Sequence, residues 1–263
     1  MTDAEPSTRA SRPPVVLLHG FLGSGEDWRA LRTGLSPTFR CICPDLPGHG
    51  DGGAPEGQGL EETSDDLVGH FDDWRNARGG LVGYSMGGRL ALLMALRHPS
   101  RLACLVLESA SPGLKTEEER QARMRHDRDL AMRLEQAVRT SAGFRDFLRA
   151  WYDQPLFASL HDHEGLVERL IESRRRSAAL AEALRVFGTG AQPSLWEALS
   201  EHRIPTLLIV GERDRKYRFL AEEMAERCPA MAMEVFANCG HNVHLEHPDG
   251  YTTAVRSFLS ANL

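Results

Sequence analysis

The sequence predicts an α/β protein in which helices cover both faces of a mostly parallel central sheet and a helical insertion forms a lid. In residues 15–111 and 201–263, short unbroken apolar runs alternate with helical patterns. Unbroken apolar runs are typical of strands buried on both faces, as in a parallel sheet between helices. Residues 112–200 contain strong helical patterns and no convincing strand. We therefore expect a sheet domain built from the two outer ranges, with residues 112–200 as the lid.

The expected elements of the sheet domain follow one another in alternation. Strands are expected over residues 15–20, 40–45, 79–85, 102–109, 204–212 and 231–236. Helices are expected over residues 59–74, 86–99, 218–228 and 248–263. The first of these helices is amphipathic, because helical spacing places four large apolar side chains roughly on one face, Leu60, Leu67, Phe71 and Trp74.

The N-terminal segment and the cysteines indicate where the protein works. Residues 1–14 are polar, rich in Ser, Thr, Pro and Arg, and lack the apolar run of a secretory signal, so we interpret them as a disordered leader. The five cysteines are scattered, with no CxxC pair, and reduced thiols are expected. Both observations favour a cytoplasmic location.

Composition and charge exclude two classes of partner. A membrane-spanning helix needs about 18 consecutive apolar residues, and the sequence has no such stretch. The net charge is −6, without the basic stripe that binding to nucleic acid requires. Residues 112–200 carry 14 Lys and Arg against 14 Asp and Glu, so all the net negative charge lies elsewhere. We expect a small-molecule substrate, and a monomer or a weak homo-oligomer.

A G-x-S-x-G motif, Gly83–Gly87, lies between an expected strand and an expected helix. Such a turn is so tight that the serine, Ser85, adopts a strained backbone, and only glycine fits two positions to either side. The strain leaves the Ser85 oxygen exposed, and the Met86 N–H would face a developing oxyanion. Taken alone, the pentapeptide also fits an ordinary glycine-rich turn.

Three further motifs identify the α/β-hydrolase fold with a catalytic triad. HGFLGS (19–24) follows the first strand, where this fold supplies the second oxyanion N–H, here assigned to Phe21. Asp214 follows an expected strand, and His241 lies in a loop before the last helix. The chain order Ser, Asp, His is the order that this fold uses. We expect His241 to take the Ser85 proton while Asp214 orients the imidazole. A member of the fold that has lost activity is the alternative.

Other histidines near these motifs do not predict a metal site. His19 is expected to be structural, and His49 to lie in a turn. His244 and His247 lie close to His241 along the chain, but the spacing is not i, i+4 on a helix and no acidic cluster accompanies them. No GxGxxG or P-loop pattern is present, so no cofactor is expected.

Longer motifs resemble those of the 2-succinyl-6-hydroxy-2,4-cyclohexadiene-1-carboxylate (SHCHC) synthases of menaquinone biosynthesis, from about residue 15 to the end. They are GYSMGGR (83–89), SPGL followed by ERQARMRHDR, WYDQPLFASL (151–160), GERDRKYR (211–218) and GHNVHLEHP (240–248). WYDQPLFASL weighs most, because it lies in the expected lid, where unrelated hydrolases diverge. The chain departs from the family in having Ser109, Ala110 and Ser111 before Pro112, where the family often has Gly-Gly-His.

The resemblance implies a lyase that needs neither cofactor nor metal. The family eliminates pyruvate from 2-succinyl-5-enolpyruvyl-6-hydroxy-3-cyclohexene-1-carboxylate (SEPHCHC) to give SHCHC. The resemblance further implies that Ser85, activated by His241, removes a carbon-bound proton from the ring, after which pyruvate departs in its enol form. No lasting acyl-enzyme would form.

The family's substrate carries three carboxylates, which a net-acidic protein must meet with local positive charge. The resemblance indicates Arg89 after the nucleophile and Arg123 in the lid as carboxylate-binding residues. A second lid arginine falls in the run 174–176, of which we choose Arg174. For each of them the alternative is an arginine that pairs with acidic neighbours in solvent. Tyr84 is expected either to donate a hydrogen bond or to line the pocket, and Trp151 and Phe157 to line or pack the lid.

Three rival functions share the predicted triad. A carboxylesterase would use it for covalent acyl transfer, and a hydrolase of carbon–carbon bonds would act on dienoic ring-cleavage products. Both predict a lid without clustered carboxylate-binding arginines. A ligand-binding protein of the same fold without catalytic activity is the third.

Overall fold

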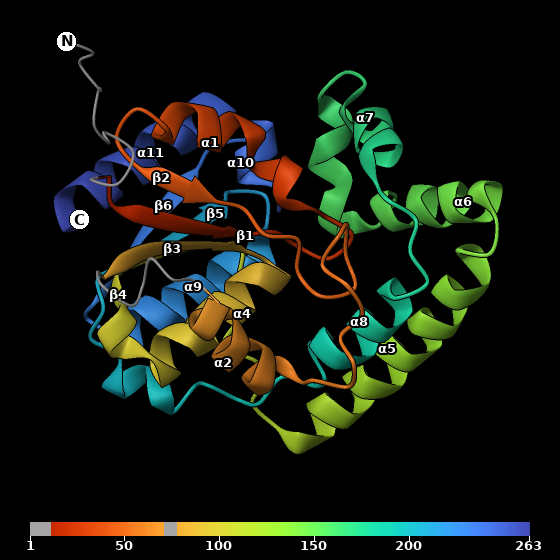
Figure 1. Cartoon of the computed structure of the whole chain (residues 1–263), viewed down its shortest axis with the longest axis horizontal. Coiled ribbons are helices and arrows are strands. Elements are labelled where there is room, and N and C mark those ends of the chain that lie inside the picture. The colour runs from red at the N-terminus through yellow and green to blue at the C-terminus, as the bar shows by residue number, and fades with distance from the viewer. Residues whose placement is uncertain (1–11, 71–77) are drawn as a thin grey trace, which may run out of the picture.

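The computed structural model describes residues 12–70 and 78–263. Most of the expected leader lies outside these residues, as do Phe71 and Trp74 of the first expected helix. The described chain forms a parallel six-stranded sheet with helices on both faces (Figure 1). This arrangement confirms the fold class that the unbroken apolar runs predict.

The strands of the sheet are all parallel to their neighbours, in the order β2-β1-β3-β4-β5-β6. In chain order they are β1 (Pro14–Leu18), β2 (Arg40–Ile42), β3 (Gly79–Tyr84), β4 (Leu102–Glu108), β5 (Thr206–Gly211) and β6 (Met231–Phe236). Tyr84 at the end of β3 is in register with Glu108 at the end of β4, which in turn is opposite Ile209 of β5. The loops that follow these three strands therefore meet at one edge of the sheet, where sites gather in open α/β folds.

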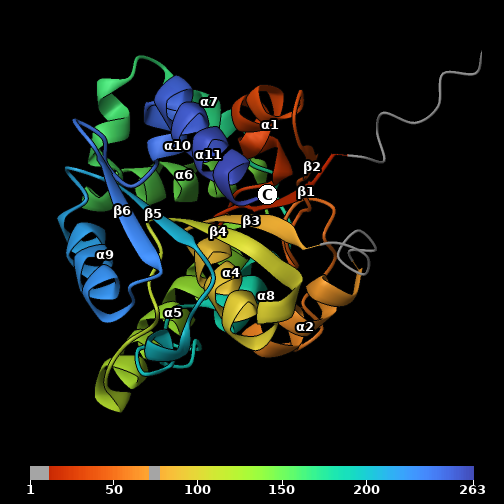
Figure 2. The same cartoon turned by 90° about the vertical axis from the view of Figure 1, so that its left-hand side faces the viewer.

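Two sets of helices enclose the sheet (Figures 1 and 2). One face is covered by α1 (Arg29–Leu35), α10 (Val243–Glu246) and α11 (Pro248–Asn262). The other face is covered by α2 (Leu60–His70), α4 (Met86–Arg97) and α9 (Arg215–Arg227). In the part of the chain that the structure describes, no helix is long and apolar enough to cross a membrane.

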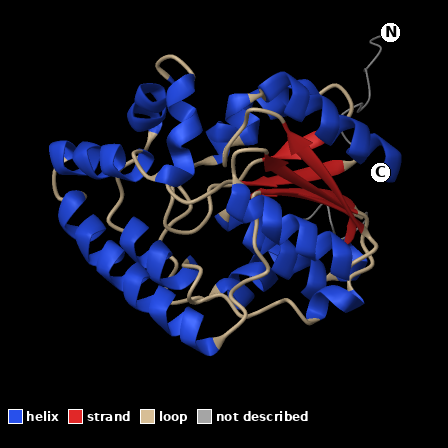
Figure 3. Ribbon diagram, turned by 180° about the vertical axis from the view of Figure 1, so that it is seen from behind, coloured by secondary structure: helices blue, strands red, loops and turns tan. Residues whose placement is uncertain are grey.

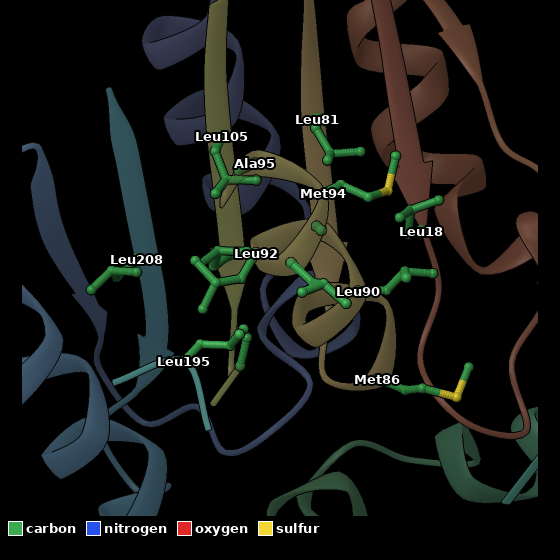
Figure 4. Packing of buried hydrophobic residues seen from close by; sticks show 14 of the residues in the cluster. Leu18, Leu81, Met86, Leu90, Leu92, Met94, Ala95, Leu105, Leu195 and Leu208 are labelled. Carbon is green, nitrogen blue, oxygen red and sulfur yellow. The ribbon is translucent and has the colours of Figure 1, made fainter. Parts of the chain in front are cut away.

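Helix α4 lies at the centre of the larger core (Figure 4). Residues 86–95 of this helix are all buried, because the helix packs on the sheet and is covered by neighbouring elements. Its sequence, MGGRLALLMALR, is accordingly apolar on all sides, as fully buried helices are. Arg89 is the one charged residue among the buried positions of α4.

The chain between β4 and β5 forms the lid, which stands beyond the carboxyl ends of the strands (Figures 1 and 3). Its elements are α5 (Glu117–Ala137), α6 (Ser141–Tyr152), a 3-10 helix (Pro155–Asp162), α7 (Leu166–Ser173) and α8 (Leu180–Phe187). They enclose a separate cluster of buried side chains that includes Phe144, Leu148 and Leu160. Leu195 and Trp196, within the range expected for the lid, pack into the sheet core instead. We therefore propose that the lid ends before Leu195.

Strand β2 is shorter than its sequence predicts. It ends at Ile42, whereas the apolar run favours a strand as far as Asp45. The carboxylate of Asp45 accepts hydrogen bonds from the backbone N–H groups of Gly25 and Asp51, both at 2.8 Å. These bonds fix the chain in a turn at the point where the strand would have continued.

A helix that the sequence analysis missed follows β1. Residues 25–28 form a 3-10 turn that runs directly into α1. Trp28, Leu31 and Leu35 are buried on its inner side, against the cluster shared with α11. Their helical spacing is the sequence signal, although the segment is too short for the pattern to stand out. Helix α9 also begins earlier than expected, at Arg215, because Asp214 caps it.

Gly87 allows α4 to cross β1 at very short range, which gives a first prediction. A Cβ at Gly87 would lie 2.2 Å from the carbonyl oxygen of Leu18 and 2.5 Å from that of His19. Backbone atoms cannot rotate away, so we predict that Gly87→Ala lowers the free energy of unfolding by about 3 kcal/mol. Urea denaturation measures the change. Gly69→Ala in α2 is the control, since a Cβ there would meet no atom of the described residues within 4 Å. Equal losses in both variants would contradict the steric explanation.

Candidate active site

Ser85 lies in the sharp turn between β3 and α4. Its φ is +50° and its ψ −107°, a region that side chains other than glycine rarely adopt. A Cβ at Gly83 would come within 2.5 Å of the Gly87 carbonyl oxygen, so no other residue fits there. The Ser85 N–H donates to the carbonyl oxygen of Glu108 at 2.9 Å, which ties the turn to the end of β4. The backbone has the strain that the G-x-S-x-G motif predicts.

The three predicted triad residues meet in one hydrogen-bonded chain. Nδ1 of His241 lies 2.6 Å from Oδ2 of Asp214, and Nε2 lies 3.1 Å from Oγ of Ser85. Because a carboxylate can only accept, Nδ1 carries the proton and Nε2 can accept from the serine hydroxyl. Asp214 and His241 are both buried. Asp214 also accepts the N–H of Tyr217 at 3.3 Å, which fixes it at the start of α9.

Two buried carboxylates hold the loop that carries His241. Glu246 accepts the N–H of Gly240 at 2.8 Å and that of Asn242 at 3.1 Å, one on each side of His241. Its side chain is fully buried. Glu108 accepts the N–H of His244 at 3.1 Å and faces the ring Nδ1 of the same residue at 2.9 Å. The loop is therefore bound to itself and to the end of β4.

The two proposed oxyanion donors, Phe21 and Met86, lie at the same pocket as Ser85. Met86 is the first residue of α4, so its N–H has no acceptor within the helix. The loop of Phe21 is fixed by His19, whose Nδ1 donates to the carbonyl oxygen of Gly20 at 2.8 Å while Nε2 accepts the N–H of Leu46 at 2.9 Å. Burial lowers the pKa of His19, which favours this neutral form.

The remaining histidines are held by other contacts. His49 is buried against His19 and Phe21, with ring centroids 5.1 and 5.4 Å away, and burial lowers its pKa to about 3. His244 faces Glu108, and Nδ1 of His247 accepts a backbone N–H at the start of α11. Across residues 12–70 and 78–263, no group of three or more His, Cys, Asp or Glu side chains is arranged to hold a metal ion.

A cavity of about 300 Å³ lies between the triad and the lid. Ser85 and His241 form its floor, and α5, α6 and α8 supply much of its wall. Trp151 of α6 lines it and packs edge-on against Phe21, with ring centroids 5.4 Å apart. Tyr84 also lines it, and its ring packs 5.4 Å from that of His241. The structure thus places both aromatic residues in lining positions.

Arg89 lies in the pocket wall without a carboxylate partner. Its guanidinium donates to Oε1 of Gln192 at 3.1 Å and to the carbonyl oxygen of Phe187 at 2.5 Å, both neutral acceptors. No Asp or Glu of the described residues forms an ion pair with it. Burial lowers the pKa of Arg89 to about 10, so the side chain stays charged at neutral pH. Such a cation can receive an anionic ligand with little competition from the protein.

Arg123 and Arg174 also line the pocket, and each is paired with an aspartate. Nε of Arg123 lies 2.7 Å from Asp127, one helical turn away on α5. Arg174 binds both carboxylate oxygens of Asp27, at 2.7 and 2.8 Å, and donates to the hydroxyl of Tyr152. The other two arginines of the run do not line the cavity, since Arg175 pairs with Asp51 and Arg176 donates to the carbonyl oxygen of Val138.

Several pocket residues escaped the sequence analysis. The ring of Tyr217 packs against His241 with centroids 4.6 Å apart. Phe157, which the sequence analysis expects to line or pack the lid, packs edge-on against the same ring at 5.9 Å. Lys216 lines the pocket beside Tyr217. Both residues belong to the first turn after Asp214, so their position next to the predicted acid could have indicated them. Asp27 carries no comparable signal, because it lies in the 3-10 turn of residues 25–28, which is 147 residues away from Arg174 along the chain.

The chain matches known proteins over nearly its whole length. Residues 13–248 match the family model described as the alpha/beta hydrolase fold. A 2-succinyl-6-hydroxy-2,4-cyclohexadiene-1-carboxylate synthase of Escherichia coli O1:K1 / APEC is 34% identical, with 94% of each chain covered. A Bacillus subtilis (strain 168) protein, provisionally named for the same activity, is 39% identical over 94% of this chain and 90% of its own.

Two solved structures are also similar. The structure of MenH from S. aureus has a TM-score of 0.89 and 31% identity, covering 99% of this chain and 97% of its own. A thermophilic esterase from Thermogutta terrifontis has a TM-score of 0.77 and 27% identity, covering 95% and 90%.

The buried position of Glu246 predicts how the His241 loop responds to its removal. Glu246→Ala leaves the N–H groups of Gly240 and Asn242 without an acceptor, and we expect the free energy of unfolding to fall by about 3 kcal/mol. Glu246→Gln keeps one acceptor oxygen, so the free energy of unfolding should fall less in this variant. Urea denaturation measures both, with Glu226→Ala on the exposed side of α9 as the control. Stability equal to that of the control would show that the two hydrogen bonds contribute nothing.

Proposed function

The chain belongs to the SHCHC synthase family of α/β hydrolases, and we propose that its triad performs the elimination that this family carries out. The proposed reaction converts SEPHCHC to SHCHC and pyruvate, a step of menaquinone biosynthesis. The observation that carries the proposal is Arg89, a buried guanidinium without a carboxylate partner among the described residues, in the wall of the pocket that holds Ser85. A substrate with several carboxylates supplies the missing negative charge.

In the proposed mechanism, the triad acts as a base and forms no acyl-enzyme. Ser85 Oγ takes a proton from a ring carbon as its own proton passes to Nε2 of His241, across the 3.1 Å contact. Asp214 stabilises the imidazolium that results. The electron pair of the broken C–H bond forms a ring double bond, and the C–O bond to the enolpyruvyl group breaks. Enolpyruvate leaves and takes up the proton held by His241 to become pyruvate. The triad is then back in its starting state.

The oxyanion donors, Phe21 and Met86, also have a role in the proposed mechanism. As the C–H bond breaks, negative charge builds on a substrate oxygen conjugated with the ring. The N–H groups of Phe21 and Met86 stabilise that charge. Both residues line the pocket beside Ser85, and α4 directs its N-terminus, with its partial positive charge, toward the same place.

Positive charge in the pocket wall supports the substrate class. Arg89, Arg123, Arg174 and Lys216 all line the cavity, against Asp27 as the lining carboxylate. Planar guanidinium groups bind carboxylates through paired hydrogen bonds. The rival hydrolases do not require such a set. Trp151 and Tyr84 fill the apolar part of the wall around the substrate ring.

An esterase is the second candidate, because a serine activated by histidine can equally attack a carbonyl carbon. The likeness to the Thermogutta terrifontis esterase favours it as the alternative. Two further expectations, the cytoplasmic location and a monomer or weak homo-oligomer, stay predictions from the sequence.

Pyruvate release tests the proposed reaction directly. Purified protein supplied with SEPHCHC is expected to release pyruvate, followed through lactate dehydrogenase and NADH absorbance. Ser85→Ala should slow release by about a thousandfold or more, because triad residues act as a unit. Hydrolysis of nitrophenyl esters without pyruvate release would favour the esterase. Tight binding of SEPHCHC with neither activity would favour a binding protein.

Arg89 gives a separate prediction. Arg89→Met keeps the bulk of the side chain and removes the buried cation, so we expect kcat/KM for SEPHCHC to fall about a hundredfold. The melting temperature should fall only modestly, because removing the cost of burying a charge offsets the loss of the hydrogen bonds to Gln192 and Phe187. Arg89→Lys should recover part of the loss. If Arg89→Met kept full turnover and only lowered the melting temperature, Arg89 would be structural.

A further inference from the structure

Lys216 is a second cation of the pocket wall for which the described residues provide no acidic partner. It lies on α9, two residues beyond Asp214, where its side chain lines the cavity and is exposed to solvent. No Asp or Glu of the described residues forms an ion pair with it. Lys115, which is exposed as well, instead binds both carboxylate oxygens of Glu223, at 2.6 and 2.7 Å.

The surroundings of Lys216 disfavour its charge. Partial burial, and after it the charge of Arg123, lower the pKa of Lys216, against the weaker opposing effect of Asp214. Lys216 is also the second residue of α9, where the helix carries partial positive charge. Its contact with the ring of Tyr217, 5.5 Å from the ring centroid, compensates only in part. A lysine whose charged form is disfavoured by its surroundings indicates a ligand that supplies negative charge.

Lys216 lines the same pocket as Arg89 and Arg123. The charge of Arg123 disfavours the charges of both Lys216 and Arg89, and Tyr217 lines the same pocket. Asp127 neutralises Arg123, which leaves Arg89 and Lys216 without a paired carboxylate among the described residues. At the other end of the cavity, Asp27 neutralises Arg174. The positive charge available to a ligand is therefore concentrated near α4, α5 and α9.

We infer that Lys216 binds a carboxylate of the substrate and forms, with Arg89 and Arg123, the end of the pocket that receives most of its negative charge. The inference rests on the proposed function, because it takes a substrate with several carboxylates as the ligand. Lys216 would contribute to recognition and not to proton transfer. Removing it should therefore raise KM and leave kcat nearly unchanged.

Steady-state kinetics of pyruvate release from SEPHCHC test this role. Lys216→Met is expected to raise KM about fivefold, a modest change because the side chain is partly exposed. Lys216→Glu should raise KM more, through repulsion, and Lys216→Arg should restore it. High salt should weaken binding to the wild type more than to Lys216→Met. Calorimetric titration of SEPHCHC into Ser85→Ala, with and without Lys216→Met, measures the same difference without turnover.

Arg215→Met is the matched control, since it removes an equal charge from the neighbouring position of α9 that does not line the cavity. It should leave KM unchanged. An equal rise of KM in this variant would overturn the inference in favour of a general charge effect. So would an unchanged KM in Lys216→Met, or a loss confined to kcat. If the wild type released no pyruvate, the proposed function itself would fail, and this inference with it.

Discussion

The site depends on one strained turn, at Ser85, where β3 passes into α4 with a positive φ. A backbone in this region costs of order 1 to 3 kcal/mol and persists only where its surroundings hold it. Here they do so in two ways. Gly83 and Gly87 let the turn and β1 approach within contact distance, and the Glu108 carbonyl oxygen accepts the Ser85 N–H. The buried core around α4 therefore keeps the serine oxygen presented to the pocket.

The same strand end also fixes the second half of the proton relay. Glu108 holds Ser85 through its carbonyl oxygen and holds the His241 loop through its carboxylate, which binds His244. Glu246 fixes that loop from the other side. The 3.1 Å contact between Ser85 and His241 is consequently held from the ends of the sheet, and from the lid Phe157 packs against the His241 ring. The lid then contributes its side chains to substrate binding, and changes within it away from Phe157 need not disturb the relay.

Features that depend on short stretches of sequence could be predicted, whereas those that depend on distant contacts could not. The sheet follows from its apolar runs, and the approach of Ser85, Asp214 and His241 from motifs at strand ends. The pairing of Arg174 with Asp27 joins the end of α7 to the 3-10 turn before α1, two segments whose sequences do not indicate this contact. The sequence pattern does not distinguish Arg174 from its two neighbours either. Only the folded lid directs the three side chains toward different partners. Strand β2 is shorter than predicted for the same reason, since the Asp45 carboxylate accepts the N–H of Gly25, which is 20 residues away along the chain.

The triad alone does not decide between elimination and acyl transfer, because both begin with His241 drawing the proton of Ser85. The decision lies in which substrate atom rests against the Ser85 oxygen. A carboxylate at Arg174 competes with Asp27, whereas one at Arg89 meets a buried cation that only neutral groups contact. A polyanion is therefore drawn toward the side of α4, the helix that begins at Ser85. Anchored there by its carboxylates, the ring presents a C–H bond to the base, while an uncharged ester finds no equivalent anchor to hold its carbonyl carbon in place.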